Sequence, residues 1–138
     1  MIHVEHLTKR YGDVTVVDDV SFDVTPGEAV ALWGPNGAGK TTTLKAICTL
    51  LKPSWGEIQV FGSSVRADPI SVRRRIGFMP DHFSMYRQMT VFEYLDFFAA
   101  AYGLQVKQRD QVIHDVLTLT DMDGRRNDLI SSLSRGMQ

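Results

Sequence analysis

One short run constrains what this chain can fold into more than any other segment, and it reads Gly34-Pro35-Asn36-Gly37-Ala38-Gly39-Lys40-Thr41. It fits the Walker A pattern G-x-x-x-x-G-K-[ST], which binds phosphate where a strand turns into a helix. The apolar residues 29–33 before the run predict a buried parallel strand, and residues 41–51 after it are able to form a helix. The sequence therefore predicts an α/β fold of the P-loop NTPase type that holds a nucleoside triphosphate.

The residue types of this run suit the chemistry of a polyphosphate. Glycine at positions 34, 37 and 39 lets the backbone approach the phosphates, and N–H groups of residues 37–40 converge on them at the positive end of the helix. Lys40 would neutralise the β- and γ-phosphate oxygens, Thr41 would offer a hydroxyl to Mg²⁺, and Thr42 would add a phosphate hydrogen bond. We therefore expect residues 34–42 to bind the nucleotide. The alternative is a glycine-rich turn without a ligand.

Composition permits this prediction and excludes several other classes of protein. The chain has 138 residues, of which 43% are hydrophobic and 22% are charged, as in an ordinary soluble domain. A net charge of −1 is not typical of a protein whose main partner is nucleic acid. The single cysteine, Cys48, cannot form an internal disulfide, which fits a reducing compartment. No apolar stretch is long enough to cross a bilayer, so we expect a membrane link only through a partner.

The hydrophobic pattern changes from strand-like to helical along the chain. Alternating residues predict an antiparallel opening with strands at 2–7, 14–17, 20–24 and 57–61, and an apolar run predicts a further strand at 76–79. A short helix is predicted at residues 72–75. Thr90 followed by Glu93 predicts a capping box that opens a helix ending at Gly103, and a second amphipathic helix covers residues 112–119. We expect a β subdomain and P-loop core at 1–80 and a helical subdomain at 81–138.

Two other groups of side chains allow more than one interpretation. The run Arg73-Arg74-Arg75 would form either a solvated helix end or a contact with lipid headgroups or an acidic partner, and so short a run favours the solvated end. Helical spacing favours core packing for Phe98 and Tyr102. The same spacing leaves Phe92 or Phe97 as the candidate for an exposed contact.

Three further segments, in the order of their appearance, resemble the ATP-binding cassette of ABC transporter ATPases. The first is Thr8-Lys9-Arg10-Tyr11-Gly12, followed by Val17-Asp18-Asp19-Val20-Ser21-Phe22, which together resemble the opening of that family. The resemblance implies that Tyr11 stacks on the adenine ring, a modest contact with little power to choose among bases. The alternative is a tyrosine packed between strands.

The second segment, Ile76-Gly77-Phe78-Met79-Pro80-Asp81, resembles the Q-loop of the family. Asp81 stands where the family usually has glutamine, although export-type members often carry an acidic residue there. The resemblance implies that Asp81 contacts Mg²⁺ or the attacking water, and its short carboxylate favours a bridging water. The alternative is a turn residue after proline.

The third segment, Leu133-Ser134-Arg135-Gly136-Met137-Gln138, resembles the L-S-G-G-Q signature of the family, from which Arg135 and Met137 depart. The resemblance implies that Ser134 and the backbone at Gly136 form a helix N-terminus aimed at the γ-phosphate on a second copy of the domain. Standing alone, Ser134 would be only a helix N-cap.

The same resemblance implies that the chain is the N-terminal portion of a cassette, truncated inside the signature and before Walker B. The Walker B strand, the general base and the switch histidine of the family would follow, so we expect this portion alone not to hydrolyse ATP.

For the complete protein, the resemblance implies an ATPase in which Lys40, Asp81 and Ser134 serve catalysis and in which Thr41 and Asp81 hold Mg²⁺. The implied partners are a second nucleotide-binding domain and a transmembrane permease, with residues 82–89 passing movement to the permease and no nucleic acid involved. The implied location is cytoplasmic, on the inner face of the cell membrane, and the implied role is to drive export. A soluble ABC ATPase of translation or DNA maintenance and a non-hydrolysing nucleotide-binding regulator are the alternatives.

Overall fold

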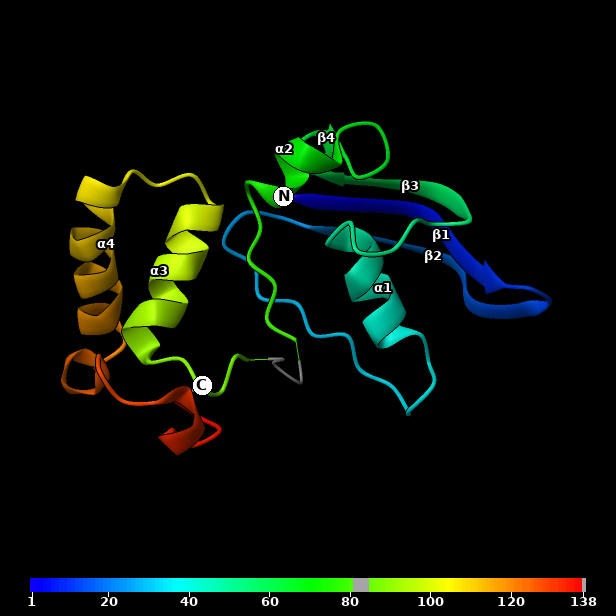
Figure 1. The fold of residues 1–138 in the computed structure, drawn as a ribbon. Helices are drawn as coiled ribbons and strands as arrows, with labels where there is room; N and C mark the ends of the chain where they lie inside the picture. The colour runs from blue at the N-terminus through cyan, green and yellow to red at the C-terminus, as the bar shows by residue number, and fades with distance from the viewer. Residues whose placement is uncertain (81–84, 138) are drawn as a thin grey trace. The chain divides into compact units, whose positions relative to one another are not determined.

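The computed structural model describes residues 1–80 and 85–137 of the chain. The chain divides into two compact units, Met1–Met79 and Pro80–Gln138 (Figure 1). Each unit has its own cluster of buried hydrophobic residues. Asp81 and His82, together with Gln138, lie outside the described residues.

The first unit is built on an antiparallel sheet. Its strands are β1 (Ile2–Tyr11), β2 (Val14–Val24), β3 (Trp55–Val60) and β4 (Ser63–Ser64), in the spatial order β2-β1-β3-β4. The predicted antiparallel opening is thereby confirmed. The two separate strands predicted at 14–17 and 20–24 are wrong, because β2 runs through both as one strand.

An irregularity in the β1–β2 ladder explains why β2 continues where the sequence predicted a break. His6 and Asp19 both have left-handed backbones, with φ of 51° and 49°, and the register shifts on either side of Leu7. Side-chain hydroxyls replace ladder bonds here, because the His6 amide donates to Ser21 Oγ at 2.8 Å and the Asp19 amide to Thr8 Oγ1 at 3.1 Å. The bulge therefore bends both strands without leaving these amides unpaired.

Helix α1 (Lys40–Ile47) packs its buried residues Ala46 and Ile47 on the apolar face of this sheet (Figure 1). Helix α2 (Pro69–Arg73) adds Val72, which is fully buried. It begins before the predicted residues 72–75 because Asp68 caps it, with the Ser71 amide donating to Asp68 Oδ1. The remaining members of this core are Val4, Leu7, Val17, Ile58, Val60 and Val65.

Two predicted strands, the parallel strand at residues 29–33 and the further strand at 76–79, are wrong, because neither run forms a strand. The side chains are exposed: Val30 to 51%, Trp33 to 97% and Met79 to 81%. A buried parallel strand depends on ladders and packing from its neighbours. Within residues 1–80 and 85–137 no strand pairs with either run, so apolar composition alone does not make them strands.

The second unit contains α3 (Val91–Ala101), α4 (Val106–Leu119) and the short 3₁₀ turns η1 (Asp123–Arg125) and η2 (Ile130–Ser132). The predicted capping box is confirmed: the Glu93 amide donates to Thr90 Oγ1 at 3.2 Å, and the Thr90 amide donates to Glu93 Oε2 at 2.8 Å. The backbone and side-chain hydrogen bonds from Thr90 also hold the pKa of the Glu93 carboxyl below its usual value.

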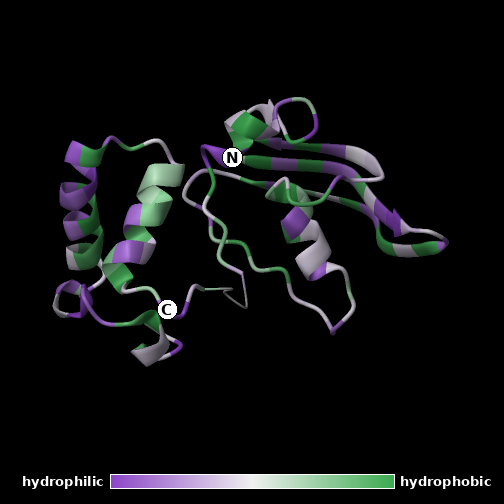
Figure 2. Ribbon diagram, in the orientation of Figure 1, coloured by the Kyte–Doolittle hydropathy of each residue, from purple (hydrophilic) through white to green (hydrophobic). Residues whose placement is uncertain are grey.

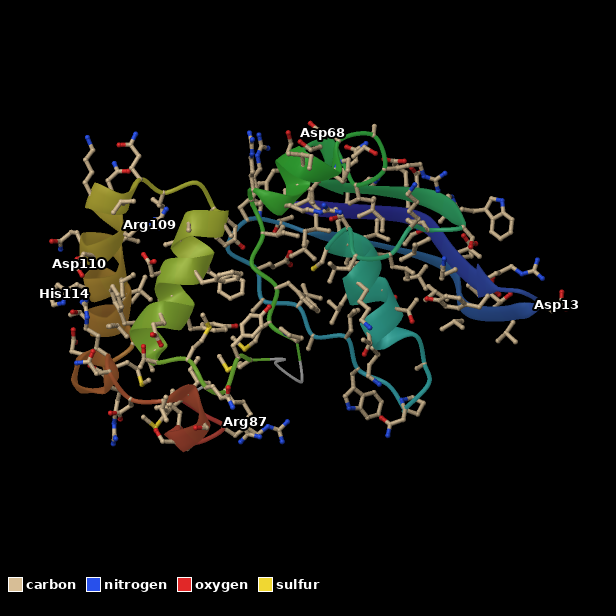
Figure 3. The ribbon with its side chains drawn as sticks, in the orientation of Figure 1. Asp13, Asp68, Arg87, Arg109, Asp110 and His114 are labelled. Carbon is tan, nitrogen blue, oxygen red and sulfur yellow. The ribbon has the colours of Figure 1, made fainter. Side chains whose placement is uncertain are left out.

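The two helices pack against each other around a small core (Figure 2 shows the hydrophilic residues along α4). Arg109 Nη1 of α4 lies 3.6 Å from Asp96 Oδ1 of α3, and Asp110 of α4 pairs with Arg126, which follows the helix. Figure 3 labels Arg109 and Asp110 on α4. No helix in the described ranges is both long and apolar enough to span a membrane. The buried members of the core are Val91, Ile113, Leu117, Ile130 and Leu133.

The predictions for the aromatic residues of α3 are partly wrong. Tyr102 is 85% exposed because α3 ends at Ala101 and Tyr102 lies beyond its last turn. Phe98 is 37% exposed and contacts Tyr94 in a tilted geometry and Phe97 edge to face instead of entering the core. Phe92 packs against the core, with the Arg126 guanidinium 4.2 Å from its ring centroid, whereas Phe97 is exposed as predicted.

A ladder of backbone hydrogen bonds joins the chain before and within the start of α3 to the chain after α4. We call it the 87–92/126–131 ladder. It includes an isolated bridge between Thr90 and Leu129. Its other bonds are Ser131 N to Arg87 O at 3.1 Å, Ile130 N to Met89 O at 3.0 Å, Val91 N to Asp128 O at 3.0 Å and Phe92 N to Arg126 O at 2.9 Å.

Two histidine–aspartate pairs across the β1–β2 hairpin make the first unit sensitive to pH. His3 Nδ1 lies 2.5 Å from Asp23 Oδ1, and His6 Nδ1 lies 2.6 Å from Asp19 Oδ1. The hydrogen bond to each aspartate raises the pKa of its histidine above the ordinary value of 6.5. A pKa raised by folding means that this stabilisation is complete below pH 6.5 and is lost as the pH rises through the folded-state pKa values.

We therefore expect the urea midpoint of unfolding to fall as the pH is raised from about 6 to about 8, across the range in which histidine titrates. The matched control is the double variant Asp19→Asn/Asp23→Asn, in which the fall should be smaller. The variant keeps all histidines, so an equal fall in the variant and in the unaltered protein would contradict the assignment to these pairs.

Candidate functional site

The glycine-rich run leads directly into α1. Gly39 is the N-cap of this helix, with a left-handed φ of 82°, and no side chain caps the helix there. The first turn of α1 contains no acidic residue. Amides in the first turn of a helix have no partner within the helix, and they lie at its positive end. The start of α1 therefore offers N–H groups and a favourable field to an anion.

Gly39 also fixes the position of the run against the sheet. A Cβ atom at this residue would lie 2.6 Å from Val16 O and 2.9 Å from Val17 Cγ2. Only glycine allows so close an approach of the run to β2. Because Val14 of the same strand pairs with Tyr11, this approach also brings the start of α1 toward the end of the β1–β2 hairpin.

The Lys40 side chain folds back over the run that precedes it. Its Nζ donates hydrogen bonds to Gly34 O at 2.6 Å and to Pro35 O at 2.7 Å. The amide of Ala38 donates to the same Pro35 carbonyl at 3.2 Å, which closes a turn. The ammonium is thus held over the loop, and oxygens of an entering phosphate would replace the two carbonyls as its acceptors.

The three threonines that follow differ in burial. Thr41 is exposed, Thr42 is half-buried and Thr43 is buried. The exposed Thr41 hydroxyl fits Mg²⁺, because this ion takes oxygen ligands and usually obtains most of them from water and substrate phosphates. No group of three His, Cys, Asp or Glu side chains within the described ranges is arranged to hold a metal ion.

Tyr11 lies at the last position of β1, beside the turn at Gly12 and Asp13. The side chain is 52% exposed, so it is not packed between strands. Lys9 Nζ lies 4.8 Å from the centroid of its ring. A half-exposed aromatic ring with a cation nearby is able to stack on a planar ligand.

The predicted signature residues belong to the other unit. Leu133 is buried in the helical core, and the chain then turns outward, with Ser134 and Gly136 exposed. The Met137 amide donates to Ser134 O at 3.0 Å, which closes a single turn. The structure thus brings together the glycine-rich run and Lys40 to Thr42 in one unit, and it presents Ser134 on the surface of the second.

Sequence analysis missed the contacts of the arginine run. Arg73 donates to both oxygens of Thr49, and Arg75 Nη1 donates to Phe61 O at 2.9 Å. All three arginines are exposed, as expected of a solvated helix end, but Arg73 and Arg75 also make hydrogen bonds within the unit. Sequence spacing carries no signal for these contacts, because Thr49 lies far from Arg73 in the chain and has a left-handed backbone.

Comparison with known proteins gives a match to the ABC transporter family over residues 17–138. The Nod factor export ATP-binding protein I of Sinorhizobium fredii is 36% identical, over 99% of this chain and 40% of that protein. The sulfate/thiosulfate import ATP-binding protein CysA of Burkholderia mallei is 37% identical, over 99% of this chain and 40% of that protein. The solved structure of cbiO1 from Clostridium perfringens, described as part of the ABC transporter complex cbiONQ, superposes with a TM-score of 0.82 at 25% identity, over 98% of this chain and 56% of that one. The chain thus spans less than half the length of the two sequence relatives.

Proposed function

Because this chain belongs to the ABC transporter family, we propose that its complete protein is the ATP-binding, energy-coupling subunit of a membrane transporter. The observation that carries the proposal is the run at residues 34–40. An uncapped helix start and the Lys40 ammonium meet there within one unit, as a polyphosphate requires. The reaction is attack of water on the γ-phosphoryl group of ATP, which yields ADP and phosphate.

Each predicted site residue has a role in this proposal. Amides at the start of α1 hold the phosphates, Lys40 neutralises their charge, and Thr42 adds a hydrogen bond. Tyr11 stacks on the adenine ring, which its half exposure supports. Ser134, exposed on the second unit, serves the nucleotide on another cassette.

Mg²⁺ is the proposed metal, and when bound it neutralises charge on the β- and γ-phosphate oxygens. The exposed Thr41 hydroxyl is the ligand that the described residues supply. Asp81, the second proposed ligand, keeps its role as a prediction from the sequence.

The proposed partners are a second nucleotide-binding domain and a transmembrane permease. A permease is supported by the names of the relatives, which are an export ATP-binding protein, an import ATP-binding protein and a member of a transporter complex. The proposed location is the cytoplasmic face of the cell membrane. We propose export as the direction, with support from the Nod factor relative, and import is the alternative that the sulfate relative supports.

Two other functions remain as competitors in the test. A soluble ABC ATPase would not co-purify with a polytopic membrane protein, whereas a transporter subunit would. A non-hydrolysing regulator would bind nucleotide without releasing phosphate. Co-purification and phosphate release by the complete protein therefore separate the three.

The first measurement is calorimetric titration of the complete protein with ATP in the presence of Mg²⁺. We expect saturable binding, and weaker binding when EDTA removes the metal, because phosphate charge is then left without its counter-ion. Absence of any Mg-ATP binding by well-folded protein would contradict the proposal.

A further inference from the structure

Helix α1 ends in a conformation that normally uses glycine. The Thr49 backbone is left-handed, with a φ of 60°. Its amide donates to Ala46 O at 3.1 Å, and the next amide, that of Leu50, donates to Lys45 O at 2.9 Å. This pair of bonds is the Schellman motif, in which glycine is favoured at the left-handed position because a side chain there is strained. A threonine at this position therefore suggests that its side chain makes a contact that glycine would not make.

The guanidinium of Arg73 binds both oxygens of this residue. Arg73 Nε donates to Thr49 Oγ1 at 2.6 Å, and Arg73 Nη2 donates to Thr49 O at 3.3 Å. The planar fork of arginine suits two such acceptors at once. Its positive charge also lies at the C-terminal end of α1, where the helix dipole is negative. The contact therefore combines geometry and charge at one end of the helix that follows the phosphate-binding run.

Arg73 is itself held by a fixed element. It follows Val72, whose side chain is fully buried in the core of the first unit. The start of the same helix is capped by Asp68, labelled in Figure 3, which accepts from the Ser71 amide at 3.1 Å. Helix α2 is thus anchored both by its cap and by its buried residue, and Arg73 extends from it to the end of α1.

The opposite end of α1 is held by the sheet. Gly39 lies so close to β2 that a Cβ there would be 2.6 Å from Val16 O. The sheet holds the end of α1 that carries the phosphate-binding amides. At the other end Ala46 and Ile47 are buried against the sheet, and Arg73 adds a hydrogen-bonded contact beyond them, at Thr49. Core packing limits the position of this end, and the Arg73 contact limits the remaining tilt of the helix, which would otherwise move the amides out of register with a phosphate chain.

We propose that Arg73 is a positioning residue for the nucleotide: by holding Thr49 at the C-terminal end of α1, it sets the direction in which the start of the helix faces the phosphates. The inference rests on the proposed function of the run at 34–40. It assigns to Arg73 no contact with the nucleotide itself.

The test compares three arginine variants of the complete protein by their Kd for Mg-ATP. Arg73→Ala should raise the Kd about tenfold, which corresponds to about 1.4 kcal/mol of binding free energy. Arg74→Ala removes the same charge from the neighbouring, exposed position and should change the Kd by less than about twofold, as for an exposed charge. Arg75→Ala breaks a hydrogen bond to Phe61 O in the same unit and should likewise leave the Kd unchanged, although it lowers the melting temperature.

A second comparison addresses the acceptor. Thr49→Ser keeps the hydroxyl that accepts from Arg73, whereas Thr49→Val keeps the shape and removes it. We expect a raised Kd for Thr49→Val and not for Thr49→Ser. In the double variant Arg73→Ala/Thr49→Val, the effects of the two substitutions on the Kd should not add. In nucleotide-free protein, the amide NMR shifts of residues 36–41 should move in Arg73→Ala and stay in place in Arg75→Ala.

The outcomes separate this inference from the proposed function. If the unaltered protein binds Mg-ATP and Arg73→Ala binds it equally well, Arg73 has no positioning role and the proposed function stands. A Kd raised equally in Arg73→Ala and Arg75→Ala would also overturn the inference, because a general loss of stability would then explain the weaker binding. Failure of the unaltered protein to bind Mg-ATP would contradict the proposed function itself.

Discussion

Replacing Gly56 by alanine is expected to prevent the first unit from folding stably. Gly56 lies in β3 with a left-handed φ of 84°, and a Cβ there would lie 2.2 Å from His6 O and 2.6 Å from Glu5 O. Both are backbone atoms of the neighbouring strand β1, so no side-chain rotation relieves the clash. The expected loss in the free energy of unfolding exceeds about 4 kcal/mol, which is comparable with the whole stability of a small domain.

Gly62→Ala is the matched control for this substitution. Gly62 has nearly the same left-handed φ, 78°, but a Cβ there would meet nothing within 4 Å. The free energy of unfolding of this variant should therefore fall by only about 1–2 kcal/mol, which is the cost of placing a side chain on a left-handed backbone. Urea unfolding followed by circular dichroism measures the loss of stability in both variants. Equal losses in the two variants would show that the close approach to β1 is relieved at little cost.

Lys40→Ala is expected to lower ATP hydrolysis by the complete protein by about 10²-fold or more, as when a single donor to transition-state charge is removed. The Lys40 ammonium is the cation held over the glycine-rich run, and it is placed there by hydrogen bonds to Gly34 O and Pro35 O. Phosphoryl transfer depends on positioning and on neutralising charge, so alanine removes both the counter-charge and the donor. The measurement is phosphate release under saturating Mg-ATP, together with the Kd for the nucleotide.

Lys45→Ala is the matched control because Lys45 is an exposed lysine in the last turn of the same helix. It removes an equal charge at the end of α1 remote from the run. Its hydrolysis rate should remain close to that of the unaltered protein. A similar loss in both variants would mean that general charge, and not the place of Lys40, governs the reaction.

The turn of the glycine-rich run into a helix could be predicted from sequence because this structure is local. Glycine spacing sets the backbone that the run can adopt, and Gly39 has the left-handed conformation that this spacing requires. The capping box of Thr90 and Glu93 is similarly contained within one helical turn. Features of this kind need no knowledge of distant residues.

Features that depend on distant partners could not be predicted in the same way. Residues 29–33 have the composition of a buried strand, but a strand also needs a neighbour to pair with. The bulge at His6 and Asp19 depends on hydroxyls from two strands at once, and the contact of Arg73 depends on the left-handed Thr49. Tyr102 followed helical spacing but fell just beyond the end of α3, and element ends are the least certain part of any prediction from pattern.

The 87–92/126–131 ladder has a consequence for the order in which the second unit forms. Its two sides come from either end of the α3–α4 hairpin, so they meet only after the chain between them has turned back on itself. Helices form within about 0.1–1 μs, whereas closing a long loop carries an entropic cost that the hairpin must first offset. We expect the ladder to be a late event in folding and to open as one cooperative segment in the native protein. Ser134 lies three residues beyond the end of this ladder, so opening of the ladder would also release the segment that presents the exposed turn at Ser134.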